Sequence, residues 1–518
     1  MMKLKYLLFV MPFISLTVSS QNVDEKQLQK LLVSESAISN LYVEPVETED
    51  LVESAIRGML SELDPHSTYL TAEEAEKSNE ALQGNFDGIG IQFNIVEDTL
   101  FIVQPLPDGP SERVGILAGD RIVTVNDTLI AGVGMSDQAI MKRLRGPKGT
   151  LVKLGIKRLG MDELLSFDVI RDKIPLNTVD VSYMATPEIG YIKISNFGIT
   201  TVEEFEKALS DLKSQGAKSL ILDLQENGGG YMMAAVGIAN EFLQKDQLIV
   251  YTQGHRSPKS GYIADGNGKF LTGKLVVLID EYSASASEIV SGSIQDWDRG
   301  TIVGRRSFGK GLVQRPIEFE DGSVIRLTIA KYFTPAGRCI QKPYGDDIDY
   351  VDDISERFNK GELTNADSIH FPDSLKYSTL VEHRTVYGGG GIMPDHFIPL
   401  DTTKTNLYYR QITAKGVVLQ TTLSYVQSQR KQLLRKYKDF EQFCNTYQPD
   451  KQLMDLLLSK AESLKIEYNE EQYNECLPII SVQLKALVAR NLWSMKEYYQ
   501  IINDLDDSLR KSIEILKL

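Results

Sequence analysis

Cysteine is scarce in this chain of 518 residues, which has only Cys339, Cys444 and Cys476. Three cysteines cannot build the disulfide framework of a small secreted domain; at most one bridge could form, and one thiol would be left over. The sequence offers none of them the setting that lowers a thiol pKa for catalysis. We therefore expect buried or incidental cysteines and look for chemistry elsewhere.

Positive charge is also in short supply, because 56 lysines and arginines face 71 aspartates and glutamates, giving a net charge of −15. A chain of this charge lacks the basic surface needed for a sequence-independent grip on nucleic acid, so we expect no nucleic-acid partner. The hydrophobic content of 42% and charged content of 25% are ordinary for a globular protein. The length predicts roughly two to four domains.

Long apolar runs are missing apart from one short run near the N-terminus. Lys3 and Lys5 precede the apolar run 7–18, which is followed by small residues and Gln21. This pattern predicts a signal peptide over residues 1–20, and the run is shorter than the roughly 20 residues of a membrane helix. A buried N-terminal helix is the alternative. We expect an exported protein, periplasmic or otherwise, with no stable membrane span.

The first part of the chain divides by pattern into a helical segment and a β-rich module. Apolar residues over 23–63 fall at helical spacing, with Pro45 separating two helices and a turn at 63–67. Short β-rich runs between glycines follow, with one helix at Asp137–Leu144. The expected strands of this β-barrel-like module are Ile89–Ile95, Leu100–Val103, Arg121–Val125, Val152–Arg158 and Ser166–Ile170.

The middle of the chain alternates buried strands with helices, which indicates an α/β layer fold. The expected elements are strands Ile189–Ile194, Ser219–Leu224, Leu275–Ile279 and Thr301–Val303 and helices Val202–Gln215, Met232–Leu243 and Ala286–Asp296. Beyond Thr402 the pattern is helical and highly charged, typical of a cap or a partner surface. The helices expected there are Leu433–Tyr447, Gln452–Ile466, Pro478–Leu492 and Lys496–Leu516.

Three serines lie where the strand Leu275–Ile279 gives way to a helix. Ser283, Ser285 and Ser287 alternate with alanines, and small residues allow the backbone to turn sharply there. A serine at a helix N-terminus lies near free N–H groups and the positive end of the helix dipole, which favour a developing oxyanion. Taken alone, these serines are better interpreted as N-capping residues.

A lysine flanked by glycines follows at Lys310, with Gln314 four residues later. A lysine acts as a base only when desolvation lowers its pKa, and Gln314 could orient its amine. An ordinary surface lysine is the alternative. Two other motifs do not fit here. Residues 304–310 match the start of a P-loop, but Gly311 stands where a P-loop has Ser or Thr. Ser307 and Lys310 have the S-x-x-K spacing of the penicilloyl-serine enzymes, but that motif needs a helix, which the glycines disfavour.

A glycine-rich turn over 223–230 (Asp-Leu-Gln-Glu-Asn-Gly-Gly-Gly) follows another buried strand. Consecutive glycines expose backbone N–H groups suited to an anion or an oxyanion, although a plain glycine turn fits as well. Together, residues 223–230, 283–288 and 307–314 resemble the C-terminal processing peptidases, the tail-specific serine proteases. Further similar motifs, over a resemblance from about Leu63 to Asp395, are residues 64–70, 144–149, 332–338 and 391–395.

This resemblance implies a set of catalytic roles. Ser285 would be the nucleophile, Lys310 the general base and Gln314 its orienting residue. The oxyanion hole would use the N–H groups of Ala286 and Gly229, for acyl transfer without a cofactor or a metal.

The resemblance also implies the overall architecture, a multidomain α/β protein. An α/β (crotonase/ClpP-like) peptidase core would carry an inserted β-rich PDZ domain, N-terminal helices and a C-terminal helical region. The expected boundaries are 21–84 for the N-terminal helices, 85–174 for the PDZ domain, 175–401 for the core and 402–518 for the helical region.

The PDZ resemblance implies a peptide partner. The loop Gly88-Ile89-Gly90-Ile91 would bind the carboxylate of an apolar protein or peptide C-terminus, which adds as a strand. Arg145 would contribute to substrate binding by coupling this domain to the active site. Whether the chain forms a homo-oligomer is left open.

The chain departs from the family at the glycine turn, which usually reads Asp-Leu-Arg-x-Asn-Pro-Gly-Gly. Gln225 replaces the arginine and Gly228 the proline, which leaves open what supports the turn. Two other functions stay open: a PDZ-based binding scaffold with an inactive core, and a histidine-dependent serine hydrolase. The histidines available to the latter are His66, His255, His370, His383 and His396.

Overall fold

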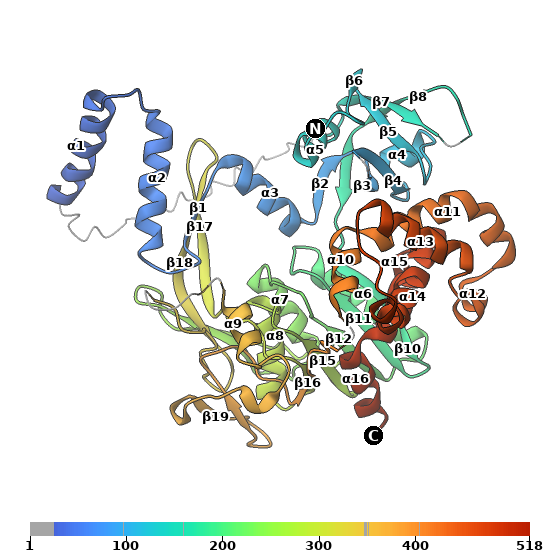
Figure 1. Cartoon of the computed structure of the whole chain (residues 1–518). Coiled ribbons are helices and arrows are strands. Elements are labelled where there is room, and N and C mark those ends of the chain that lie inside the picture. The colour runs from blue at the N-terminus through green and yellow to red at the C-terminus, as the bar shows by residue number, and fades with distance from the viewer. Residues whose placement is uncertain (1–24, 97, 159, 346–349, 351, 404) are drawn as a thin grey trace, which may run out of the picture. The chain divides into compact units, whose positions relative to one another are not determined.

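The computed structural model describes residues 25–518 apart from 97, 159, 346–349, 351 and 404 (Figure 1). The predicted signal peptide, residues 1–20, lies outside the described residues. The chain divides into two compact units, residues 1–69 and residues 70–518, which are taken in turn below. Among the described residues, no helix is both long enough and apolar enough to cross a membrane.

In the first unit, two helices precede a tight turn. Helices α1 (Glu25–Leu41) and α2 (Thr48–Ser61) lie on either side of Pro45, as predicted. The turn is built on Asp64, whose Oδ1 accepts hydrogen bonds from the amides of His66 and Ser67, both at 2.9 Å. Strand β1 (Thr68–Leu70) follows. The carboxylate of Asp64 therefore holds the turn, and the backbone of His66 contributes to it.

The second unit opens with helix α3 (Ala72–Gln83), which the sequence analysis missed, and with the β-rich module. The module's sheet runs β3-β4-β5-β7-β8, with β6 beside β5, and β2 pairs separately with β9. Strand β3 is an edge strand among the described strands, so one side of it is open to another chain. The bounds are β2 Asn85–Gly88, β3 Ile91–Val96, β4 Thr99–Pro105, α4 Pro110–Arg113, β5 Arg121–Val125, β6 Thr128–Leu129, α5 Asp137–Leu144, β7 Leu151–Lys157, β8 Leu165–Ile170 and β9 Asp172–Pro175.

The α/β region is built on a six-stranded sheet with the order β10-β11-β12-β15-β16-β21. Strand β10 is antiparallel to β11, and the other neighbours are parallel. The four strands predicted from apolar runs are therefore adjacent in space. The bounds are β10 Val179–Thr186, β11 Ile189–Ile194, α6 Thr201–Ser214, β12 Ser219–Asp223, α7 Met232–Asn240, β15 Leu275–Ile279, α8 Ala286–Asp296, β16 Thr301–Gly304 and β21 His396–Phe397.

Further strands and short helices surround this sheet. Strands β13, β14, β17 and β18 form part of a second, antiparallel sheet, and β19 pairs with β20. The sequence analysis did not anticipate these strands. Their bounds, with those of the short helices, are β13 Leu248–Gln253, β14 Ser260–Ile263, β17 Leu312–Glu318, β18 Val324–Phe333, α9 Asp353–Asn359, η1 Ala366–Ser368, η2 Asp373–Leu375, β19 Lys376–Ser378 and β20 Thr385–Tyr387.

The C-terminal region is helical as predicted, but two predicted helices are wrong. Leu433–Tyr447 is not one helix, because Asp439 caps a new helix by accepting a bond from Gln442 N at 2.8 Å. Lys496–Leu516 is likewise divided, since Asp506 caps a separate last helix. The observed elements are α10 Leu407–Ala414, α11 Val417–Lys436, α12 Phe440–Thr446, α13 Lys451–Ser463, α14 Glu470–Leu492, α15 Met495–Ile502, η3 Asn503–Leu505 and α16 Asp507–Lys517.

The last helix, α16, covers one face of the six-stranded sheet (Figure 1). Successive residues of β12 point to opposite faces: Leu220 and Leu222 pack in one core with α6, α7 and α8, whereas Ile221 packs with Leu509 and Leu516 of α16. The C-terminal region thus supplies the third layer of the α/β fold, a role that its sequence did not reveal.

We expect Leu509→Ala to destabilise the second unit, because it removes buried apolar atoms between α16 and the sheet. Leu509 is 5% exposed. A loss of about 2–4 kcal/mol in the free energy of unfolding is the usual result of such a cavity. Leu505→Ala is the matched control, since Leu505 is 37% exposed. Urea unfolding of both variants measures the effect, and equal stabilities would contradict the packing role of α16.

The cap of α16 should make stability depend on pH. Burial, together with the negative charge of Asp223, raises the pKa of Asp506 to about 6. The folded state therefore binds this proton more tightly than the unfolded state does, so the stabilising protonation is present at low pH and is lost as pH rises through about 6.

Asp506→Asn should keep the cap and remove this dependence. We expect the variant to be more stable than the wild type at pH 8, on the order of 1–2 kcal/mol. The difference should fall by more than half at pH 4.5 and vanish only below the ordinary aspartate pKa of 3.8 that applies in the unfolded state. Urea unfolding at both pH values measures this, and a wild type that is the more stable of the two at pH 8 would refute the assignment.

Candidate active site

Ser285 occupies a strained turn between strand β15 and helix α8. Its backbone has φ 54° and ψ −108°, a left-handed conformation that residues with a Cβ rarely adopt. It is the N-cap residue of α8, so its side chain lies at the end of the helix where free N–H groups gather. A serine on a sharp strand-to-helix turn of this kind is typical of a nucleophile.

The neighbouring serines are structural. Ser283 Oγ donates to Leu224 O at 2.7 Å, Ser287 Oγ to Asn227 O at 2.9 Å and Ser307 Oγ to Glu288 Oε1 at 2.6 Å. All three are fully buried, whereas Ser285 is partly exposed. Burial and hydrogen bonding thus separate Ser285 from the other serines, which the sequence could not do without the resemblance.

The buried carboxylate of Glu288 joins the segment of Ser285 to the segment of Lys310. Its Oε2 accepts hydrogen bonds from Ser285 N at 2.8 Å and Lys310 N at 2.9 Å. Its Oε1 accepts from Gly309 N at 2.7 Å and from Ser307 Oγ. Burial raises the pKa of Glu288, and these four hydrogen bonds oppose that shift by stabilising the carboxylate.

Tyr332, on β18, makes a second link between the same two segments. Its hydroxyl lies 3.0 Å from Ser285 O and 2.7 Å from Lys310 O, so its single proton can be donated to either carbonyl. Burial raises the pKa of Tyr332 well above its ordinary value, so the hydroxyl stays protonated as a donor. The sequence analysis did not assign Glu288 or Tyr332 a role, although the spacing of Ser285 and Glu288 is that of a capping box.

Lys310 lies in a closely packed loop before strand β17. A Cβ on Gly309, whose φ is +90°, would lie 3.0 Å from Gly391 N, and a Cβ on Gly311 would lie 2.9 Å from Gln341 N. Glycine at both positions therefore allows the loop to approach the backbone around it. Lys310 Nζ donates to Gln314 Oε1 at 3.4 Å, the contact expected of an orienting residue.

The glycine turn lies directly against the serine. A Cβ on Gly229 would lie 2.9 Å from Ser285 Cβ and 3.1 Å from Ala286 N. Asn227 O accepts hydrogen bonds from Ala284 N at 3.0 Å and from Ser287 Oγ, which fixes the turn to the serine segment. The amide of Gly229 donates to Asn227 Oδ1 at 2.9 Å. The two expected oxyanion residues are therefore neighbours, with the Gly229 amide already hydrogen-bonded.

The expected carboxylate-binding loop, Gly88 to Ile91, connects β2 to the edge strand β3. The module itself holds the loop's carbonyl groups: Ser111 Oγ donates to Ile89 O at 2.7 Å and Leu106 N to Gly90 O at 3.0 Å. The carbonyl groups of Ile89 and Gly90 are thus fixed by the module itself, which holds the loop in place.

Arg145 follows helix α5 and contacts the segment that leads into the β-rich module. Its guanidinium forms an ion pair with Glu80 of α3 and lies 4.6 Å from the centre of the Phe86 ring. These contacts connect the end of α5 with α3 and β2; the coupling role of Arg145 stays a prediction.

The described residues also include the side chains considered for other chemistries. No three His, Cys, Asp or Glu side chains gather there into a group that could hold a metal ion. The three cysteines are free thiols. Of the histidines considered for a hydrolase, four are exposed, namely His255, His370, His383 and His396.

We expect Glu288→Gln to disrupt the site, because an amide places an NH₂ group against amides that already donate. Two donors would face each other in a buried space, at a cost of about 1–3 kcal/mol in the free energy of unfolding. Reaction of Ser285 with a serine-directed fluorophosphonate should slow at least tenfold, measured by intact mass. Glu318→Gln, at an exposed glutamate of β17, is the control. Equal rates in the two variants would contradict the role of Glu288.

Four family models match separate parts of the chain. Peptidase family S41 matches residues 188–350, and a PDZ domain matches residues 88–169. The N-terminal domain of the activating protease CtpB matches residues 14–74. Residues 408–494 match a family of unknown function, DUF8443. The matched peptidase segment contains the serine, the lysine and the glycine turn described above.

Three curated proteins are similar to this chain over more than 300 residues each. The carboxy-terminal processing protease CtpB of Bacillus subtilis (strain 168) is 36% identical over 333 residues, 63% of this chain and 68% of that protein. A carboxy-terminal-processing protease of Bartonella bacilliformis is 35% identical over 338 residues, 63% of this chain and 75% of that protein. CtpA of the same Bacillus is 35% identical over 324 residues, 62% and 68% of the two chains. The chain therefore belongs to the family of PDZ-containing carboxy-terminal processing serine proteases.

Proposed function

We propose that this protein is an exported serine endopeptidase that recognises apolar protein C-termini through its PDZ domain and cleaves with a Ser285–Lys310 dyad. The observation that carries the proposal is the strained backbone of Ser285, φ 54° and ψ −108°, on a segment that Glu288 ties to the amide of Lys310. Strain of this kind persists where the surroundings fix it, and it is commonly found at catalytic groups.

The reaction would be acyl transfer through a covalent intermediate. Ser285 Oγ attacks the peptide carbonyl while Lys310 Nζ takes its proton, and Lys310 then returns a proton to the leaving amine. A water molecule, activated by the Lys310 amine, then hydrolyses the ester. Lys310 must be neutral to accept the proton, and Gln314 Oε1, 3.4 Å from Nζ, orients it.

The tetrahedral oxyanion would be bound by the amides of Ala286 and Gly229. Ala286 is the first residue of α8, where the helix dipole adds to the stabilisation. The Gly229 amide donates to Asn227 Oδ1 in this structure, so it must be shared with or released to the oxyanion. A rearrangement of this size within the turn would accompany substrate binding.

The PDZ domain would supply substrate selection. An apolar C-terminal peptide would extend the sheet at edge strand β3, with its carboxylate on the amides of Gly88 to Ile91. The core that cleaves it would be of the crotonase/ClpP-like type and span residues 175–401, with the PDZ domain at 85–174. Removal of residues 1–20 would accompany export to the periplasm or beyond the cell membrane.

Ser285→Ala should abolish cleavage of a fluorogenic peptide with an apolar C-terminus, at least 10³-fold in kcat, while the peptide still binds. Lys310→Met should behave in the same way, because the base is lost. Ser287→Ala should retain at least a tenth of the activity, since its hydroxyl contacts only backbone in this structure. Turnover and fluorescence anisotropy measure the two properties separately.

Two results would overturn the proposal. Activity in Ser285→Ala with none in Ser287→Ala would move the nucleophile. A wild-type protein that binds the peptide but cleaves none between pH 6 and 10 would instead be a PDZ-based binding scaffold.

A further inference from the structure

A lysine is buried in the central sheet behind the glycine turn. Lys193 lies on β11 and is 8% exposed, in register with Asp223 at the end of β12. Its Nζ lies 3.1 Å from Asp223 Oδ2. Buried lysines are rare because desolvation of the ammonium group is unfavourable unless hydrogen bonds replace its water. Burial by itself would lower the pKa of Lys193, but the surrounding carboxylates, Asp223 foremost, together outweigh it and the pKa is raised.

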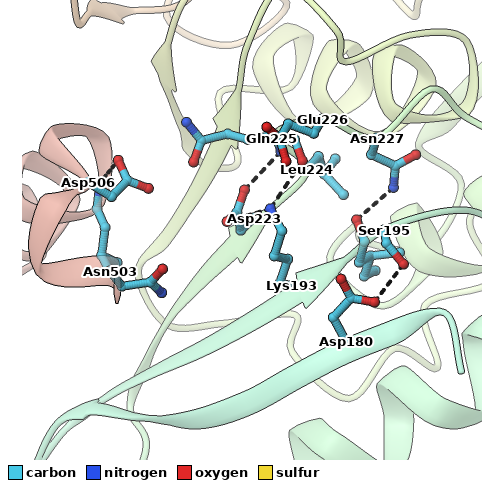
Figure 2. A network of polar contacts seen from close by, with 12 residues as sticks. Asp180, Lys193, Ser195, Asp223, Leu224, Gln225, Glu226, Asn227, Asn503 and Asp506 are labelled. Carbon is cyan, nitrogen blue, oxygen red and sulfur yellow. Dashed lines mark hydrogen bonds and ion pairs between the residues drawn. The ribbon is translucent and has the colours of Figure 1, made fainter. Parts of the chain in front are cut away.

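The lysine has a second acceptor, in the glycine turn itself. Lys193 Nζ donates to Gln225 O at 3.1 Å, and Asp223 Oδ1 accepts from Gln225 N at 2.8 Å (Figure 2). Both backbone groups of Gln225 are therefore held by one ion pair. Gln225 stands where the family's turn usually carries an arginine. In this chain a cation from the adjacent strand, Lys193, contacts the backbone of that position.

The two residues after Gln225 are hydrogen-bonded to the segment that carries Ser285. Glu226 N donates to Asp280 Oδ1 at 3.0 Å, and Glu226 adopts a φ of +62°. Asn227 follows, and its Nδ2 donates to Ile194 O at 2.8 Å. Its carbonyl accepts from Ala284 N, and its Oδ1 accepts from Gly229 N. Displacement of Gln225 would therefore move the residue that connects the oxyanion amide to the serine segment.

The C-terminal helices lie near the same ion pair. Asn503 and Asp506 lie across from Asp223, on the C-terminal ribbon coloured red in Figure 1 (Figure 2). Asn503 Nδ2 donates to Tyr183 OH at 2.8 Å, and Tyr191 OH donates to Asp223 Oδ2 at 2.5 Å. Chain from the end of the sequence therefore lies beside the buried Lys193–Asp223 pair.

We propose that Lys193 is a positioning residue that holds the oxyanion turn through Gln225 O, with the C-terminal helices keeping the contact dry. The inference rests on the proposed function, because it assigns the turn to oxyanion binding. A donor inside a low-dielectric site fixes its acceptor more firmly than one in water. The position that the family fills with an arginine is here supported through the backbone.

Lys193→Met tests the proposal in the full-length protein with the same fluorogenic peptide. We expect kcat to fall at least tenfold, within the roughly 10²–10³-fold effect of losing one oxyanion donor outright, and KM to stay within twofold. KM should hold because the peptide's tail is bound by the PDZ domain. Lys218→Met is the matched control, since Lys218 pairs with Glu188 at the exposed start of the same two strands.

A second variant separates positioning from simple burial of charge. Lys193→Met leaves Asp223 buried without its cation, which by itself destabilises the fold. In Lys193→Met/Asp223→Asn both charges are gone, but Gln225 O still lacks its donor. We expect stability to recover in the double variant while kcat stays at least tenfold low. Recovery of kcat together with stability would overturn the proposal, as would an unchanged kcat in Lys193→Met.

Hydrogen exchange provides a readout that does not need turnover. Amides of residues 224–230 should exchange at least tenfold faster in the double variant than in the wild type, and Lys218→Met should leave them unchanged. Unchanged exchange in the double variant would overturn the inference even if the wild type is an active peptidase. If the wild type shows no turnover but residues 224–230 still exchange faster in the double variant, the peptidase proposal is refuted. The role of Lys193 in holding the turn is then kept.

Discussion

The geometry of the candidate site depends on one buried carboxylate. Glu288 accepts from the backbone amides of Ser285, Gly309 and Lys310 and from the Ser307 hydroxyl, so both oxygens are fully used. A backbone amide cannot be removed by mutation, and leaving one buried without an acceptor is costly. The serine and lysine segments are therefore fixed relative to each other by main-chain groups.

The sheet explains why such distant segments meet at all. Parallel strands end at the same edge, so the segments after β12, β15 and β16 converge there, although they are separated by long stretches of sequence. These segments carry the glycine turn, Ser285 and Lys310, respectively. Asn227 O and Glu288 then join them pairwise. The strand order thus brings the three segments close together, and hydrogen bonds to Asn227 O and Glu288 fix their exact positions.

Much of this arrangement could be predicted from sequence, because apolar runs mark strands such as Leu275–Ile279 and the motifs mark their ends. Local patterns could not reveal the partners of Glu288 or Lys193, since these come from other strands and loops. The helix predicted over Leu433–Tyr447 failed for a local reason: amphipathic spacing continues across residues 437–439, although Asp439 caps a new helix. Nor does the amphipathic pattern of α16 say which surface it covers.

The C-terminal region also supports the sheet that carries the candidate site. A parallel sheet must be covered on both faces, and α6, α7 and α8 cover only one of them. Without α16, Ile221 would face water, and the proposal above extends this to the Lys193–Asp223 pair, whose mutual attraction would weaken severalfold in water. Water would also compete for Gln225 O. If Lys193 positions the glycine turn as proposed, the packing of the last helix and the rigidity of that turn depend on neighbouring parts of the same buried face.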